Sequence, residues 1–318
     1  MSLATTAISK HAATNQEKAL DFSSMNILAL AGIMLAIGAG WRVLDQFVLG
    51  LGDTWLNILP SKLFPFLIII GFFLKYRPGE IATVLGLSRK SLRAHLVVGI
   101  LIGLSISLLI DFGGTIVYAL IFDPAYPLDI HVLAPGLLGY MFIFFLTNAL
   151  LEETLFRGLI QNGLKTRLSP KWAIILSAIV FGVWHAGWPI VNGAAGTAAV
   201  IEVSSMVFFT TVLGLLFGVY YERFSLGQSL VGPIAVHTII NFVGECFKIG
   251  PEPMIQGPDL VFSTPGIMAT TLLIFLVVFS ALFLILWKYR IQDVETLRNR
   301  GSGYSQDIGH SGSQEEVA

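Results

Sequence analysis

The chain has 318 residues, of which 55% are hydrophobic and only 12% are charged. A soluble domain carries about 25% charged residues, so the composition excludes a soluble enzyme, a nucleic-acid-binding protein and a disordered protein. The formal net charge of −1 gives no basic field for nucleic acid, and a single cysteine excludes an internal disulfide. These properties predict an all-α, polytopic transmembrane helix bundle whose main partner is the lipid bilayer.

Eight apolar stretches are predicted to cross the membrane, because a span needs roughly 17–25 apolar residues. In chain order they are residues 26–49, 57–75, 94–122, 135–158, 170–187, 202–221, 229–247 and 260–287. We expect a polar N-terminal tail (1–25), a single membrane domain (26–290) and a flexible C-terminal tail (291–318). Lys62 lies near the start of the second stretch, where its long side chain would extend to the interface.

Lysine and arginine indicate the orientation, because they are enriched in cytoplasmic loops. With both termini in the cytoplasm, 15 of the 19 Lys and Arg residues lie in inside segments and 2, Lys62 and Lys248, lie outside. The other two, Arg42 and Arg157, lie within spans. We therefore expect an integral protein of the plasma membrane with cytoplasmic termini.

Two adjacent glutamates follow the apolar run of the fourth stretch. A charged group at the bilayer centre costs at least about 2.5–3.5 kcal/mol, so such residues point to a functional site. Glu153 and Arg157 are four residues apart and share a helical face, which predicts an ion pair. Glu152 projects about 100° away from that face and is the carboxylate left free.

Polar residues also interrupt the fifth and seventh stretches. His185 ends the sequence Phe181 to His185 and, taken alone, is more typical of a packed histidine than of a catalytic one. His237 and Asn241 are four residues apart and project from one helical face. Alone, this pair is also consistent with hydrogen bonds between membrane helices.

Counting residues along the helices places these groups at one depth. A turn is predicted near Leu168, with Glu152 lying 16 residues before it and His185 lying 17 residues after it. In an antiparallel hairpin the two residues are therefore level, because a helix rises about 1.5 Å per residue. His237 and Asn241 lie roughly 12–18 Å above the start of their helix. We expect all four side chains to converge on the cytoplasmic side of the membrane.

This set of residues can carry out hydrolysis in two ways. Glu152 can act as a general base on a water molecule that His185 helps to orient, while His237 and Asn241 donate hydrogen bonds to the oxyanion. Alternatively, Glu152, His185 and His237 form a three-ligand zinc site with water as the fourth ligand. The residues alone do not choose between these mechanisms.

The three motifs, E-E-x-x-x-R, F-x-x-x-H and H-x-x-x-N, resemble those of the CPBP or ABI intramembrane endopeptidases. This family includes the type II CAAX prenyl proteases and their bacteriocin-processing relatives, and the resemblance covers about residues 135–247. It implies Glu152 and His185 as the water-activating pair, His237 and Asn241 as the oxyanion site, and Glu153 and Arg157 as supporting residues. It also implies cleavage of a membrane-associated protein or peptide, by a glutamate or a zinc mechanism, without implying that the substrate is prenylated.

Two other functions remain compatible with the sequence. In a proton-coupled transporter, Glu152, His185 and Asp111 would relay protons. In a non-catalytic partner or immunity protein of the same fold, Glu152 would have no chemical role. Outside these motifs, Arg42 and Asp45 are three residues apart and are expected to pair with each other.

Overall fold

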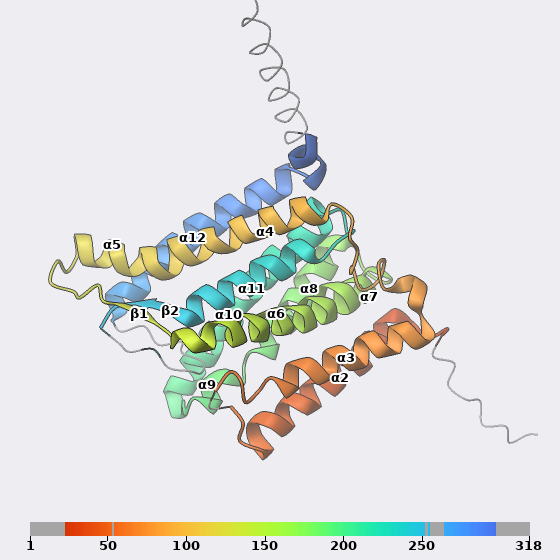
Figure 1. Ribbon diagram of the computed structural model, residues 1–318, viewed down its shortest axis with the longest axis horizontal. Helices are drawn as coiled ribbons and strands as arrows, with labels where there is room; N and C mark the ends of the chain where they lie inside the picture. Colours follow the sequence, from red (N-terminus) through yellow and green to blue (C-terminus); the bar gives the residue numbers. More distant parts are fainter. Residues whose placement is uncertain (1–22, 53, 252–253, 255–263, 297–318) are drawn as a thin grey trace, which may run out of the picture.

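The computed structural model describes residues 23–52, 54–251, 254 and 264–296 (Figure 1). The α-helices are α2 (Ile27–Val43), α3 (Pro60–Tyr76), α4 (Leu92–Ile106), α5 (Gly113–Ile121), α6 (Leu138–Glu153), α7 (Asn162–Lys165), α8 (Pro170–Trp184), α9 (Trp188–Val191), α10 (Gly196–Val219), α11 (Val231–Cys246) and α12 (Pro265–Lys288). Wider π-helical turns are η1 (Leu44–Val48), η3 (Ser107–Phe112), η5 (Thr154–Gln161) and η6 (Tyr220–Phe224), and short 3₁₀ turns are η2 (Pro78–Glu80) and η4 (Pro135–Leu137). The predicted all-α membrane fold is confirmed, and the predicted tails lie largely outside the described residues.

The predicted count of eight spans is not confirmed. Six helical segments of the described residues are long and apolar enough to cross a membrane: Ile27–Val48, Leu92–Ile121, Pro135–Lys165, Pro170–Val191, Gly196–Phe224 and Pro265–Lys288. The stretch predicted at 229–247 forms α11, a shorter apolar helix of 16 residues. The stretch predicted at 57–75 forms α3, which has 17 residues and carries Lys62 in its first turn.

The predicted turn near Leu168 is present. The chain leaves α7 at Lys165 and enters α8 at Pro170, whose ring occupies the first helical turn. Proline suits this position because its missing N–H would have no partner there. The antiparallel arrangement that placed Glu152 and His185 at one depth is therefore the observed one.

One small sheet was not predicted. Strands β1 (Ile130–Val132) and β2 (Phe247–Ile249) pair antiparallel, with Ile130 opposite Ile249. The pair joins the segment after α5 to the end of α11 (Figure 1). A three-residue strand is too short to show the alternation of apolar and polar residues that identifies a strand in a sequence.

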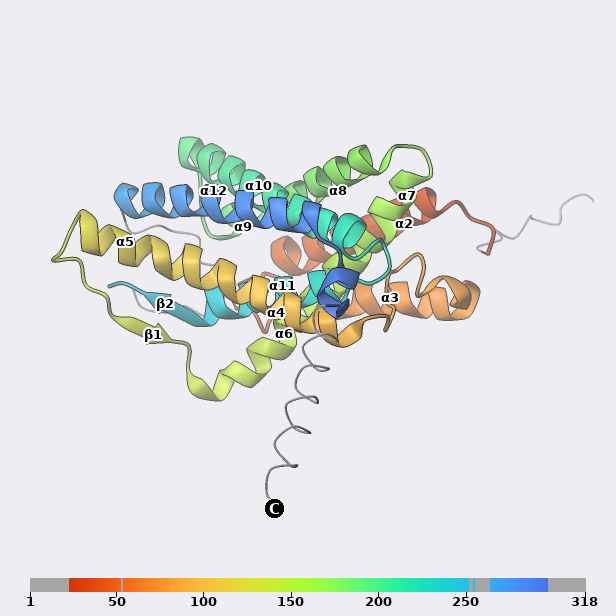
Figure 2. The same cartoon turned by 90° about the horizontal axis from the view of Figure 1, so that it is seen from above.

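Helix α11 lies between α4 and α6, and α10 packs along α8 (Figures 1 and 2). Small residues permit the close approach of α4 and α11, since a Cβ on Gly99 would lie 2.7 Å from the carbonyl oxygen of Gly232. Such contacts are common where membrane helices cross, because backbones can then pack directly. This packing brings His237 on α11 towards the end of α6, where the two glutamates lie.

Candidate active site

Glu152 lies in the last turn of α6 and is completely buried. Its Oε2 atom is 3.6 Å from Nε2 of His185 and 3.6 Å from Nε2 of His237. Among the described residues, no donor forms a hydrogen bond with this oxygen. Three atoms that can bind a water molecule therefore face one another, from α6, from the end of α8 and from α11.

His185 is held by its own helix. Its Nδ1 atom lies 2.8 Å from the carbonyl oxygen of Phe181 and donates to it, since a carbonyl can only accept. The Phe181 ring also packs edge-on against the imidazole, with ring centroids 4.7 Å apart. In the neutral form, Nε2 therefore carries the lone pair and points it towards Glu152.

His237 is held by the second glutamate. Its Nδ1 donates to Oε1 of Glu153 at 2.8 Å, and its ring stacks on Phe217 with centroids 5.2 Å apart. Glu153 was expected to support only its own helix through Arg157. The structure adds a second task, because the carboxylate also sets the orientation of His237.

The predicted ion pair between Glu153 and Arg157 is confirmed, with Nη1 donating to Oε1 at 3.0 Å. Both side chains are fully buried. Arg157 also donates to the carbonyl oxygen of Gly214 at 3.1 Å, and its guanidinium lies 4.3 Å from the ring centre of Phe181. Arg157 lies in η5, so this ion pair ties the π-helical segment to the end of α6. π-Helical turns of this kind often occur at functional sites.

Asn241 lies one turn beyond His237 on α11 and is half-buried. Among the described residues it forms no hydrogen bond with Glu152, His185 or His237, so its link to the cluster is its place on the helix. Within the described ranges its amide makes no hydrogen bond, which leaves both amide N–H groups free to bind a ligand.

Two cations that were expected elsewhere complete the surroundings of Glu152. Lys62, expected to extend to the interface, is 3% exposed and donates from Nζ to Oε1 of Glu152 at 2.9 Å. Arg42, expected to pair with Asp45, lies 4.0 Å from the same oxygen, and no ion pair with Asp45 occurs in the described part of the chain. Trp184, the residue before His185, donates from Nε1 to Oε1 at 3.1 Å.

A signal for Lys62 was present in the sequence. A lysine within an apolar stretch needs a partner or a route to water, and for Lys62 the structure shows a partner in place of the expected route to water. Its partner lies 90 residues away, so the spacing of residues along one helix could not identify it.

A family comparison bears on these residues. Residues 134–243 match the family model described as Rce1-like, type II CAAX prenyl endopeptidase Rce1-like. The predicted family resemblance is confirmed. No curated protein and no solved structure matches the chain.

The matched segment contains all four residues of the predicted hydrolytic set, Glu152, His185, His237 and Asn241. The family supports an intramembrane, CAAX-type endopeptidase activity with a protein or peptide substrate. The two cations at Glu152 come from α2 and α3 and lie outside the matched segment.

Zinc was one of the two mechanisms considered for this site. In the described part of the chain, no group of three or more His, Cys, Asp and Glu side chains is arranged to hold a metal ion. The charges also disfavour one, because the Glu152 carboxylate already faces Lys62 at 2.9 Å and Arg42 at 4.0 Å. A divalent ion on Oε2 would be repelled by both cations. The residues do not fit a zinc site as they are placed.

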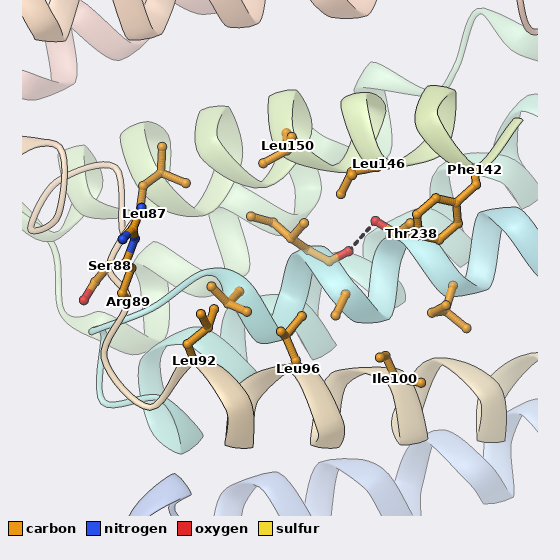
Figure 3. A pocket seen from close by; sticks show the side chains of 14 residues that line it. Leu87, Ser88, Arg89, Leu92, Leu96, Ile100, Phe142, Leu146, Leu150 and Thr238 are labelled. Atoms are coloured by element: carbon orange, nitrogen blue, oxygen red, sulfur yellow. Dashed lines mark hydrogen bonds between the residues drawn. The ribbon is translucent and has the colours of Figure 1, made fainter. Parts of the chain in front are cut away.

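A groove between α4 and α6 is separate from this cluster (Figure 3). It has a volume of about 320 Å³ and runs between α4 and α6 over α11. Its walls are mainly aliphatic, and the hydroxyl of Thr238 is used within its own helix, donating to the carbonyl oxygen of Ile234 at 2.7 Å. None of the four predicted site residues lines this groove.

Proposed function

We propose that this protein is an intramembrane endopeptidase that hydrolyses a peptide bond of a membrane-associated protein or peptide without a metal ion. The proposal is supported by the surroundings of Oε2 of Glu152. This buried carboxylate oxygen has two histidine Nε2 atoms 3.6 Å away. These distances are too long for direct hydrogen bonds, and a water molecule to one side of the three atoms, about 2.8 Å from each, would bridge them.

In the proposed reaction, this water donates one hydrogen bond to Oε2 of Glu152 and the other to Nε2 of His185. Glu152 removes a proton as the water oxygen attacks the scissile carbonyl carbon, which gives a tetrahedral oxyanion. When the C–N bond breaks, the proton passes from Glu152 to the leaving amine. The carboxylate is restored, and a carboxylic acid and an amine leave the site.

His237 and Asn241 are placed to stabilise the oxyanion. Because Nδ1 of His237 already donates to Glu153, Nε2 can donate to the oxyanion when the ring is protonated. The carboxylate of Glu153 stabilises the positive charge of that imidazolium, as the buried aspartate does in the Ser–His–Asp triad. The free amide of Asn241 supplies the second donor from the same helix.

The topology inferred from the charge distribution belongs to the same proposal. Both termini would lie in the cytoplasm, and the site would open towards that side of the plasma membrane.

The decisive experiment uses purified protein in detergent with quenched-fluorescent peptides, including a farnesylated peptide that ends in a CAAX sequence and its non-prenylated counterpart. Glu152→Gln keeps the size and polarity of the side chain but removes the base. We expect it to lower the cleavage rate by about 10²- to 10⁴-fold. Equal rates above a no-enzyme control would refute the role of Glu152 as the base, and no cleavage by either protein would favour a non-catalytic membrane partner.

A further inference from the structure

Lys62 is a buried lysine in α3, a helix that lies outside the segment matched by the family model. Its side chain is 4% exposed, and its ammonium lies 2.9 Å from Oε1 of Glu152. Among the described contacts of that carboxylate this is the shortest, ahead of Trp184 at 3.1 Å and the two histidines at 3.6 Å. The reacting carboxylate is therefore held by a helix outside the matched segment.

The two oxygens of Glu152 have different surroundings. Oε1 accepts from Lys62 and Trp184, while Arg42 lies 4.0 Å away. Oε2 has no hydrogen-bond donor among the described residues and faces the two histidine nitrogens. One oxygen is thus an anchor, and the other is the atom available to a water molecule.

We propose that Lys62 is a positioning residue of the hydrolytic site, which fixes Oε1 of Glu152 so that Oε2 faces the two histidines. The inference rests on the proposed function. A carboxylate turns readily about its last torsion, which has a broad, two-fold profile. Without an anchor, Glu152 would present either oxygen at varying angles, and a base must lie within hydrogen-bond reach of the proton that it removes.

The charge of Lys62 contributes to this role. Hydrogen bonds between charged groups are roughly twice as strong as those between neutral groups, and Trp184 provides only a neutral donor. A buried carboxylate also needs a compensating charge, because an uncompensated one is strongly destabilising. Since α3 packs against α6, the Lys62–Glu152 pair sets the position of the carboxylate relative to both helices.

The test compares Lys62→Met, Lys62→Arg, Glu152→Gln and Lys165→Met on the peptides described above. Lys165 is the matched control, because its Nζ also lies 2.9 Å from a glutamate oxygen, that of Glu222. We expect Lys62→Met to lower kcat by about 100-fold with KM unchanged, which is the cost of a 1 Å misplacement of a reacting group. Lys62→Arg should recover part of that loss, and Lys165→Met should cleave like the wild type.

The outcomes separate this inference from the proposed function. If Glu152→Gln is inactive but Lys62→Met keeps the wild-type kcat, the positioning role is refuted and the proposed function stands. A higher KM at unchanged kcat, or no recovery in Lys62→Arg, would also refute it. If Glu152→Gln cleaves as fast as the wild type, the proposed function itself fails.

A thermal-unfolding cycle tests the pair without a substrate. The wild type, Lys62→Met, Glu152→Gln and the double variant are compared in the same detergent. Coupled residues should give a double variant less destabilised than the sum of the two single changes. Strictly additive shifts would show that the pair is absent, and the inference would then be wrong.

Discussion

Oε1 of Glu153 accepts a hydrogen bond from Nδ1 of His237 at 2.8 Å, which joins two motifs that lie 84 residues apart in the sequence. The bond defines Nδ1 as the protonated nitrogen and turns Nε2 towards Glu152. The same oxygen of Glu153 accepts a hydrogen bond from Nη1 of Arg157 at 3.0 Å. Glu153 therefore has two roles: it stabilises the α6–η5 segment, and it orients a histidine of the site.

Replacing Glu153 with glutamine should lower both the stability of the protein and its catalytic rate. The substitution removes the negative charge and leaves the guanidinium of Arg157 buried without compensation, which costs about 3–5 kcal/mol. We expect a lower unfolding temperature in detergent and a lower kcat on the peptides, because His237 loses its charged acceptor. Glu222→Gln, which removes the part-buried partner of Lys165, should lower the unfolding temperature much less. A Glu153→Gln protein as stable as the wild type would contradict the role given to this carboxylate.

Asn241 should matter for the rate and not for the fold. In the described part of the chain its amide makes no hydrogen bond, so Asn241→Ala removes no hydrogen bond that stabilises the protein. Loss of one donor to the oxyanion typically costs about 10²- to 10³-fold in kcat. We expect a loss of that size with an unchanged unfolding temperature, measured by peptide cleavage and thermal unfolding of the same sample. A wild-type kcat would remove Asn241 from the proposed oxyanion site.

The two histidines should differ in what their loss does to stability. His185 donates to the backbone of its own helix, whereas His237 donates to the buried carboxylate of Glu153. His185→Gln should reduce kcat and leave stability near the wild-type value. His237→Gln should reduce kcat and also lower the unfolding temperature, because a buried charge loses a hydrogen bond. Equal destabilisation by the two changes would argue against this assignment of partners.

Metal removal should leave the activity intact. Lys62 and Arg42 already balance the charge of Glu152, so the proposed reaction has no step that needs zinc. We expect a purified sample dialysed against a chelator to retain its cleavage rate, and elemental analysis to find no stoichiometric zinc. One bound zinc per chain, with activity lost on its removal and restored on its return, would overturn the metal-free mechanism.

Sequence reasoning succeeded where the relationships were local or followed from helix geometry. The Glu153–Arg157 pair is an i,i+4 contact, and the meeting of Glu152 with His185 follows from their nearly equal distances to the turn near Leu168. It failed for Lys62, because the choice of neighbouring helix depends on the packing of the whole bundle. A rise of 1.5 Å per residue gives the depth of a side chain but not its partner across a helix interface.

Arg42 illustrates the same limit. The spacing rule predicts a pair with Asp45 three residues later, yet a π-helical turn begins at Leu44, directly between the two residues. A π-helical turn changes the direction of the side chains that follow it. The sequence gives no sign of this π-helical turn, because the turn has no capping residue that would mark where it begins. The guanidinium instead lies 5.0 Å from the ring centre of Trp184, close to Glu152.

The last prediction concerns Gly182, which lies three residues before His185 on α8. A Cβ at this position would lie 2.7 Å from the carbonyl oxygen of Val207 on α10, a backbone atom that cannot turn aside. Gly182→Ala should therefore push α8 away from α10 and displace His185. Overpacking of this kind typically costs about 1–3 kcal/mol, and the displacement should lower kcat as well.

Gly71→Ala on α3 is the matched control for this change, since a Cβ there meets no atom within 4 Å. In a helix, alanine is favoured over glycine by about 1 kcal/mol, so this variant should be as stable as the wild type or slightly more so. Thermal unfolding and peptide cleavage of the two variants would show whether the α8–α10 contact holds His185 in place. If Gly182→Ala matched Gly71→Ala in both measurements, the position of His185 would have to depend on contacts other than this helix crossing.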